Sequence, residues 1–422
     1  MTSHDEQRLS DALRRQAETT DPTLLSLDDV TSRARGIRRR RVATGLVAAA
    51  AVVAVVVPTA MVAAERDDSS SPPVATNTPD ATPTGTQEPT QDPSPSDPAS
   101  PRKRTRTSVL GDLPSGEAPR IAVLVGDEVV TPDGDRVQVG ADTVYVGMVG
   151  DSVVSIERTG SEQGTFVVRG TDGSVVLESP ASIDGALSVT PDRTAAAYVG
   201  TDGRIHTWTP DDGDLTFSEP LENIQLGPMS GSEPGTCKEQ EPEGGGCTVV
   251  FNRGEGSAGY ATSHGIVDDL PAFLKVNDAT GRVYAGQTQS DPEGSCSEIR
   301  RIDTGRTTFK TCHNTLGSFS PDGSHIEAGP AYLDGLCCAT SDVLDAGTGK
   351  PVLTLEARGG PESSYISQVG WEDDSHVLAV VLNGSAWRVV RVDLNGSAEL
   401  VDIGQAPAGD AGEVPVRLAV GS

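Results

Sequence analysis

Residues 377–404 read VLAVVLNGSAWRVVRVDLNGSAELVDIG, and the tetrapeptide Asn-Gly-Ser-Ala occurs in them twice, at positions 383 and 395. Asn-Gly between two apolar runs is a strong local signal for a β-hairpin, because a type I′ turn needs positive φ at both central residues. In the middle run Val390, Val392 and Leu394 share one face, while Arg391 and Asp393 point to the other. The stretch therefore predicts a meander of three antiparallel strands, at 377–382, 387–394 and 399–403.

A lone meander of this size is marginal in water, so its apolar face must be buried on further sheet. The same alternation of short apolar runs and turn residues continues from Arg120 to Val420. Segments starting at 187 (LSVTPDRTAAAYV) and 316 (LGSFSPDGSHIEAG) align so that Asp192 matches Asp322, 130 residues later. That offset is three periods of about 43, the length of a four-stranded propeller blade. The sequence predicts an all-β fold, a β-propeller of about seven blades over residues 118–422.

Two turn segments resemble those of TolB-like and WD-repeat-like propellers, SFSPDG at 318–323 and VTPDRTAAAYV at 189–199. The resemblance implies the fold and a structural turn, and it implies no chemistry. Arg193 stands where the motif has Gly, and WEDDSH at 371–376 lacks its Pro. The Gly-His and Trp-Asp dipeptides of true WD repeats are missing, so the partners of that subfamily are not implied.

An uncharged stretch of 23 residues, 42–64, is long enough to cross a membrane as a helix. Six arginines between 33 and 41 precede it without an acid, and acids follow it. The positive-inside rule then predicts a single-pass anchor in the cell membrane, with the N-terminus cytoplasmic and the C-terminal domain extracellular. The alternative is a signal peptide cleaved after Ala64.

Two further segments flank this predicted transmembrane helix. Residues 1–41 have helical apolar spacing and are expected to form a cytoplasmic amphipathic tail, either a membrane-adjacent stalk or a docking handle. Such short tails resemble those of actinobacterial membrane proteins linked to sigma factors. Residues 65–117 are expected to be a disordered linker rich in Pro, Ser and Thr, and its basic cluster RKRTRT (102–107) is expected to be solvated.

The charge of the predicted propeller limits its partners. Residues 108–422 carry 19 bases and 47 acids, a net charge of −28. A domain with this charge repels phosphate backbones, so we expect no nucleic acid among its partners.

All six cysteines follow the apolar stretch, which suggests disulfides in an oxidising compartment. Cys237 and Cys247 flank one local loop, and Cys296 and Cys312 flank a segment that reads as a hairpin, so these two pairs are predicted to bond. Cys337 and Cys338 are left with a vicinal bond or pairing elsewhere. The cluster Cys312, His313, Cys337 and Cys338 lacks the CxxC spacing of a metal site.

Catalytic and cofactor motifs are absent from the sequence. It holds no G-x-S-x-G, H-E-x-x-H or G-x-G-x-x-G, and GTGK at 347–350 lacks the Ser or Thr of a P-loop. The histidines follow no ligand or triad spacing, and acid pairs such as Asp268-Asp269 and Asp373-Asp374 are expected by chance among so many acids. We therefore assign no catalytic, cofactor-binding or metal residue.

The reading that follows is an anchored extracytoplasmic propeller that binds a protein, peptide or glycan of the cell envelope without turnover. The polar segments 228–247 and 286–296 are expected to be the variable loops that present this site. Two alternatives remain: an extracellular hydrolase or lyase on a propeller scaffold, and a sensor coupled to sigma-factor-linked signalling through residues 1–41.

The predicted topology has a direct test. A reporter that is active only outside the cell should be active when fused after residue 110 and inactive when inserted near residue 20, because the uncompensated arginines hold the N-terminal side in the cytoplasm. The reverse pattern contradicts the topology. A mature chain that begins near Glu65 supports the cleaved signal peptide instead.

Overall fold

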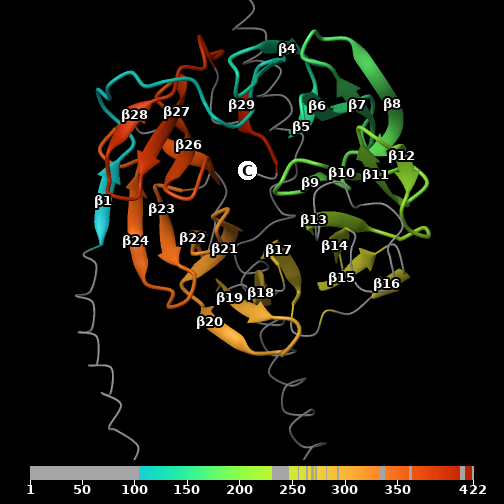
Figure 1. Ribbon diagram of the computed structural model, residues 1–422. Helices are drawn as coiled ribbons and strands as arrows, with labels where there is room; N and C mark the ends of the chain where they lie inside the picture. The colour runs from blue at the N-terminus through green and yellow to red at the C-terminus, as the bar shows by residue number, and fades with distance from the viewer. Residues whose placement is uncertain are drawn as a thin grey trace, which may run out of the picture. The chain divides into compact units, whose positions relative to one another are not determined.

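The computed structural model describes residues 104–230, 247–254, 256–262, 265–267, 270, 273–281, 283–291, 294–331, 338–360, 364–408 and 414–420. The chain divides into two compact units, Met1–Ser96 and Asp97–Ser422, and every described residue belongs to the second. The described part holds seven β-sheets arranged in a ring, and it contains no helix (Figure 1). The predicted all-β propeller of about seven blades is confirmed.

Each sheet is one blade, and the blades are numbered here in chain order. Blade 1 contains β29 (Val416–Leu418), β2 (Val123–Val125), β3 (Glu128–Val130) and β4 (Arg136–Gln138). Blade 2 contains β5 (Thr143–Val149), β6 (Ser152–Arg158), β7 (Gln163–Arg169) and β8 (Val175–Ser182). Blade 3 contains β9 (Leu187–Val189), β10 (Ala196–Val199), β11 (Ile205–Thr209) and β12 (Gly213–Thr216).

The remaining four blades follow the same order of strands. Blade 4 contains β13 (Ile224–Ser230), β14 (Thr248–Arg253), β15 (Ser257–Thr262) and β16 (Gly265–Val267). Blade 5 contains β17 (Lys275–Thr280), β18 (Val283–Asp291), β19 (Gly294–Arg301) and β20 (Thr307–Thr311). Blade 6 contains β21 (Asn314–Phe319), β22 (His325–Pro330), β23 (Thr340–Asp345) and β24 (Pro351–Glu356), and β1 (Thr105–Ser108) is added at its edge. Blade 7 contains β25 (Tyr365–Trp371), β26 (His376–Asn383), β27 (Ala386–Asp393) and β28 (Ala398–Leu400).

The two Asn-Gly-Ser-Ala segments are successive hairpin turns of blade 7, as predicted. Gly384 lies between β26 and β27 with φ of 69°, and Gly396 lies between β27 and β28 with φ of 98°. Glycine takes this left-handed conformation without a steric penalty. The predicted meander is therefore confirmed, and β25 completes the blade on its inner side.

Both faces of a blade are buried, which explains the unbroken apolar run at 377–382. Alternate residues of β26 (Val377, Ala379 and Val381) share a core cluster with Val343, Leu353 and Leu355 of blade 6. The residues between them (Leu378, Val380 and Leu382) share another cluster with Val123, Val125 and Val416 of blade 1. Because each blade is packed between two neighbours, the ring supplies the burial that one meander lacks.

The ring closes where the two ends of the propeller meet in blade 1. The C-terminal strand β29 pairs antiparallel with β2, with Val123 opposite Leu418 and Val125 opposite Val416. This pairing joins the N-terminal and C-terminal strands of the ring. It removes the exposed edges that an open ring would leave.

The internal repeat also matches the blades. Asp192 lies in the turn between β9 and β10 of blade 3, and Asp322 lies in the corresponding turn of blade 6. The 130-residue offset between them therefore spans three blades, as the period of about 43 predicts.

The chain joins the propeller earlier than predicted, at residue 104 instead of 118. β1 pairs parallel with β24, and further along the chain the Gly116 amide donates to the Leu400 carbonyl at 2.7 Å. Residues 104–117, named the strap here, thus run along the outer strands of blades 6 and 7. Arg104 and Arg106 form ion pairs with Asp342 and Glu356, each at 3.0 Å, so the described part of the basic cluster is paired with protein carboxylates and is not merely solvated.

Two other expectations need correction or lie outside the described residues. The segment 286–296 was expected to be a variable loop, but it belongs to strands β18 and β19. Its polar residues pair across a hairpin, from Gln287 opposite Ser297 to Asp291 opposite Gly294. Residues 42–64 are not described. Among the residues that are described, no helix is long and apolar enough to span a membrane.

The strap should contribute to stability through its apolar residues. Val109 is fully buried in the cluster between blades 6 and 7. We expect Val109→Ala to lower the free energy of unfolding of the full chain by about 2 kcal/mol, through lost burial and a small cavity. Urea denaturation measures this change.

Val176→Ala is the matched control, because Val176 is 63% exposed on β8 and its truncation should change stability by less than about 0.5 kcal/mol. Equal effects of the two substitutions would show that the strap is not part of the cooperative fold.

Candidate functional site

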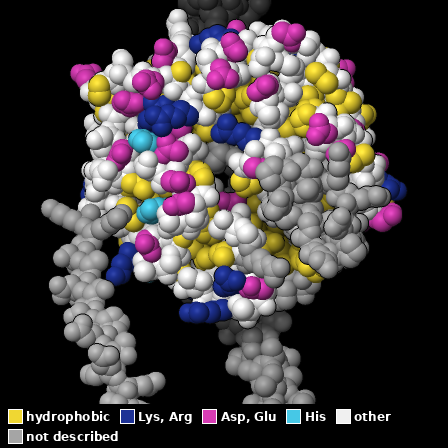
Figure 2. Space-filling model, viewed as in Figure 1, with side chains coloured by type: hydrophobic (Ala, Val, Ile, Leu, Met, Phe, Trp, Pro, Cys, Tyr) yellow, Lys and Arg dark blue, Asp and Glu magenta, His cyan; other side chains and the backbone are white. Residues whose placement is uncertain are grey.

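A cavity of about 480 Å³ lies at the centre of the ring. Its lining comes from β9, β13, β17, β21 and β25, from the turns that follow β9, β17, β21 and β25, and from Ile121, Ala419 and Val420 of blade 1. Figure 2 shows the corresponding hollow on the face in view. Six of the seven blades therefore contribute to one concave surface of the size that small-molecule and peptide sites have.

Irregular pairing of the inner strands shapes this cavity. The ladder between first and second strand shifts register at Leu226/Met229 in blade 4, Val276/Asp278 in blade 5 and Leu316/Phe319 in blade 6. Such bulges bend a strand and re-aim its side chains. The residues left over by the shifts include Pro228, Asn277 and Ser318, and all three line the cavity.

Two carboxyl groups lie close together where blades 5 and 6 meet. Asp278, on β17, accepts a hydrogen bond from the backbone amide of Phe319 at 2.6 Å. Glu327, on β22, accepts one from the hydroxyl of Ser318 at 3.0 Å. Gly317 leaves room for the second carboxyl, since a Cβ at this position would lie 2.9 Å from Glu327 Cδ.

Burial sets the proton affinity of both acids. It raises the pKa of Asp278 to about 6. It also raises the pKa of Glu327 to about 7, and the nearby charge of Asp278 adds to this shift. Removing water disfavours the charged form, and a like charge disfavours it further. Both carboxyls therefore ionise closer to neutral pH than an exposed acid does.

A second charged cluster fixes the end of the strap to blade 7. Arg391 forms ion pairs with Glu372 and Glu399, and the side chains of Glu372 and Arg391 are 0% and 5% exposed. The same guanidinium donates to the Ala118 carbonyl at 2.8 Å, and the Arg120 amide donates to Glu372 Oε1 at 2.8 Å. The hydrogen bonds to Glu372 raise the pKa of Arg391 above its ordinary value. Glu372 is among the residues around the cavity, but its carboxylate is buried and its oxygens are engaged within the protein.

The aspartates of the repeated turns are structural, as expected. Asp192 accepts hydrogen bonds from the Thr194 amide and hydroxyl, at 3.2 and 2.7 Å, and Asp322 accepts the equivalent bonds from Ser324 at 2.9 and 2.8 Å. An aspartate that caps its own turn in this way replaces a backbone hydrogen bond.

The acid pair Asp373-Asp374 and the neighbouring His376 lie in a network of polar contacts at the turn after β25. Asp373 Oδ1 and the Ser375 hydroxyl both contact His376 Nδ1, at 2.9 and 3.0 Å. On the other ring nitrogen, Asp393 Oδ2 lies 3.7 Å from His376 Nε2. Asp374 accepts the Asp322 amide at 2.9 Å, so it joins the turns of blades 6 and 7. His264 and Asp268-Asp269 lie outside the described residues.

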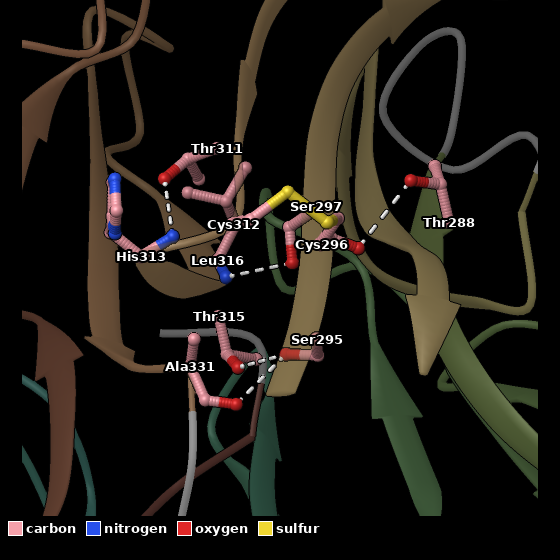
Figure 3. Close-up of a disulfide and its surroundings, with 10 residues drawn as sticks. All are labelled: Thr288, Ser295, Cys296, Ser297, Thr311, Cys312, His313, Thr315, Leu316 and Ala331. Atoms are coloured by element: carbon pink, nitrogen blue, oxygen red, sulfur yellow. Dashed lines mark hydrogen bonds between the residues drawn. A yellow bond between two sulfur atoms is a disulfide. The ribbon is translucent and has the colours of Figure 1, made fainter. Parts of the chain in front are cut away.

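The predicted Cys296–Cys312 disulfide is confirmed (Figure 3). Ser297 pairs with Thr311 across β19 and β20, so the disulfide continues this ladder by one residue pair. The cysteines are 16 residues apart, and closing a loop of that length contributes about 3 kcal/mol in the chain-entropy model. The bond removes Cys312 from any metal-binding cluster.

Two other cysteines, Cys247 and Cys338, are also disulfide-bonded. Cys237, the predicted partner of Cys247, lies outside the described residues, and so does Cys337. The Cys237–Cys247 bond therefore stays a prediction, and the partner of Cys338 stays open between Cys337 and another cysteine. Within the described ranges no group of three His, Cys, Asp or Glu side chains is placed to hold a metal ion.

One residue of this site is marked by a signal in the sequence, and the two buried acids are not. Arg193, noted as a departure from the Gly of the turn motif, lines the cavity. Asp278 lies within strand β17. No pattern separates Asp278 and Glu327 from the other acids of this domain, because their burial depends on how two blades pack.

Comparison with known proteins adds the fold and no activity. No protein-family model matches the chain. No curated protein matches it either. Among solved structures, the one described as "Structure of U3-55K" is similar over 64% of this chain and 83% of that one, with 13% sequence identity and a TM-score of 0.44. The protein is a seven-bladed β-propeller, and a likeness of this size says nothing of its function.

The raised pKa values predict how stability depends on pH. The pKa values of Asp278 and Glu327 are raised from 3.8 and 4.5, so the folded chain holds these protons more tightly than the unfolded chain. The stability that the protons contribute is complete below pH about 4 and is lost as the pH rises through about 6 to 7. Glu327→Gln removes the cost of ionisation and should raise the free energy of unfolding by about 1–3 kcal/mol at pH 8, with little change at pH 4.

Urea denaturation at the two pH values measures the effect. Glu219→Gln is the control, since that side chain is 83% exposed and its substitution should change stability by less than about 0.5 kcal/mol at either pH. A Glu327→Gln variant that is less stable than the wild type at pH 8 would contradict the assignment.

Proposed function

We propose that this chain is a membrane-anchored extracytoplasmic propeller, of the TolB-like or WD-repeat-like kind, that binds a ligand in its central cavity without turnover. The ligand is a protein, peptide or glycan of the cell envelope. The anchor and its orientation rest on the uncharged stretch 42–64 and on the arginines before it. The disulfide Cys296–Cys312 supports an oxidising compartment.

One observation carries the binding proposal: the cavity is lined by six blades and its acids are engaged within the protein. Asp192 caps its own turn, Asp278 accepts the Phe319 amide, and Glu372 is held by Arg391. A general acid, base or nucleophile must be free to approach substrate and must have a partner that tunes it. A concave surface of mixed polarity whose acids are engaged is suited to holding a ligand.

Charge narrows the class of ligand. The excess of 28 acids over bases in residues 108–422 disfavours polyanions such as nucleic acid. A neutral or basic partner, or one with a single negative group, meets less repulsion.

The proposal is tested by narrowing the cavity and comparing what the full-length chain captures from envelope extracts. Pro321 lines the cavity and is exposed, so Pro321→Trp should reduce its volume with little effect on folding. We expect the wild type and the Val176→Trp control to capture a species that the Pro321→Trp variant does not capture. Val176 is 63% exposed on β8, in the one blade that contributes no residue to the cavity lining.

Equal capture by both variants contradicts binding in the cavity. Hydrolysis of a peptide or glycan by the purified chain, abolished by one carboxylate substitution, contradicts binding without turnover.

A further inference from the structure

Arg193 is the charged side chain of the cavity lining that has no partner. Among the described residues its guanidinium makes no hydrogen bond and no ion pair, whereas Asp192, Asp278 and Glu372 are all engaged. Its backbone is held firmly, since the Arg193 amide donates to the Thr190 carbonyl and its carbonyl accepts from the Gly150 amide, each at 2.8 Å. A fixed backbone therefore presents an unpaired cation at the cavity.

The residue also occupies a conformation in which an arginine is unexpected. Arg193 has φ of 56°, and the corresponding residue of blade 6 is Gly323, with φ of 70°. A glycine meets this requirement without strain, whereas an L-residue with a side chain does not. Strain of this kind persists where the surrounding structure enforces it, and it is concentrated at functional sites. The side chain of Arg193 is therefore retained against a local cost.

The electrostatic setting of Arg193 is unfavourable without a ligand. The side chain is partly buried, and burial lowers the pKa of its guanidinium, with no carboxylate acting in the opposite direction. A buried cation without a counter-ion loses hydration and gains nothing in return. An anionic group of a ligand would supply the missing partner, and a carboxylate fits the guanidinium in a bidentate geometry.

Further features of the lining indicate what should accompany that carboxylate. Ser188, Ser230 and Thr280 also line the cavity, and their hydroxyls have no hydrogen-bond partner among the described residues. Hydroxyls of this kind can bind the amide groups of a peptide, and the apolar lining can cover its side chains.

The aromatic rings of the lining argue against a glycan. Phe319 and Trp371 are 6% and 1% exposed, so neither offers an open face on which a sugar ring would lie. The described surface of the cavity therefore suits a peptide better.

We infer that the cavity binds an apolar peptide segment whose carboxylate pairs with Arg193, the hydroxyls of Ser188, Ser230 and Thr280 meeting its amides. This inference rests on the proposed function and names its ligand class. The carboxylate belongs either to the C-terminus of the peptide or to an acidic side chain within it.

Calorimetric titration of the purified full-length chain tests the inference with three acetylated tripeptides. Ac-Val-Leu-Ala carries a free C-terminal carboxylate, Ac-Val-Leu-Ala-NH₂ is the neutral match, and Ac-Val-Glu-Leu-NH₂ carries the acid within the chain. We expect one of the two carboxylate probes to bind about ten- to a hundredfold more tightly than the neutral peptide, as charge-assisted hydrogen bonds would give. Which probe does so identifies the source of the carboxylate.

Arg193→Gly should abolish this preference and leave the affinity of the neutral peptide unchanged. Glycine is compatible with the left-handed backbone, so the melting temperature of the variant should not fall, and the variant separates binding from folding. Arg204→Gln is the control, because Arg204 lies outside the cavity and should leave the preference intact.

The inference is overturned by equal affinities for carboxylate and amide probes. It is also overturned by an undiminished preference in the Arg193→Gly variant, or by no binding of either carboxylate probe at millimolar concentration. Binding of an N-acetylglucosamine trimer in place of the peptides overturns it too. The capture experiment decides separately whether the proposed function stands. If Pro321→Trp loses the captured species and Val176→Trp retains it, the cavity binds a ligand, and only the inferred ligand class is wrong.

Discussion

Pairing between β2 and β29 is the constraint on which the rest of the structure depends. The three residue pairs of this ladder join strands almost 300 positions apart in the chain, and all of their residues except Arg417 are buried. Every blade has two apolar faces and needs a neighbour on each side, as β26 shows with its alternating contacts to blades 6 and 1. An open row of the same blades would leave two such faces in water, together with two strand edges.

Closure also explains how the strap can lie on blades 6 and 7 although it precedes blade 1 in the chain. A chain that enters at blade 1 begins beside the last blade, so residues 104–117 can run along blades 6 and 7 before reaching β2. Just after the strap, the Ala118 carbonyl accepts a hydrogen bond from Arg391, which ion pairs with Glu372 and Glu399 hold in place on blade 7. With Glu372 wholly buried, removing one partner would leave an uncompensated charge, which is far more costly than the pair itself is favourable.

The sequence predicted the features that local chemistry decides. The turns at Gly384 and Gly396 predicted the hairpins of blade 7, and the spacing from Asp192 to Asp322 predicted the number of blades. The hairpin between the two cysteines predicted the Cys296–Cys312 bond. It missed the strap, because β1 pairs with an edge strand 248 positions away and its own composition resembles the linker before it. It also placed a loop at 286–296, where polar residues pair across the ends of β18 and β19. Such pairings depend on tertiary context, which overrides local preference.

Features of the cavity lower the stability of the fold, whereas closure of the ring raises it. Bulged inner strands lose ladder hydrogen bonds, Arg193 is held in a left-handed conformation, and ionising Asp278 and Glu327 costs free energy near neutral pH. Each of these features would be removed cheaply by a single substitution if stability alone were at stake. They are tolerated because the blades on either side over-determine the path of every inner strand, so local strain cannot relax. The centre of the ring can therefore carry unsatisfied and strained groups that an isolated sheet could not hold.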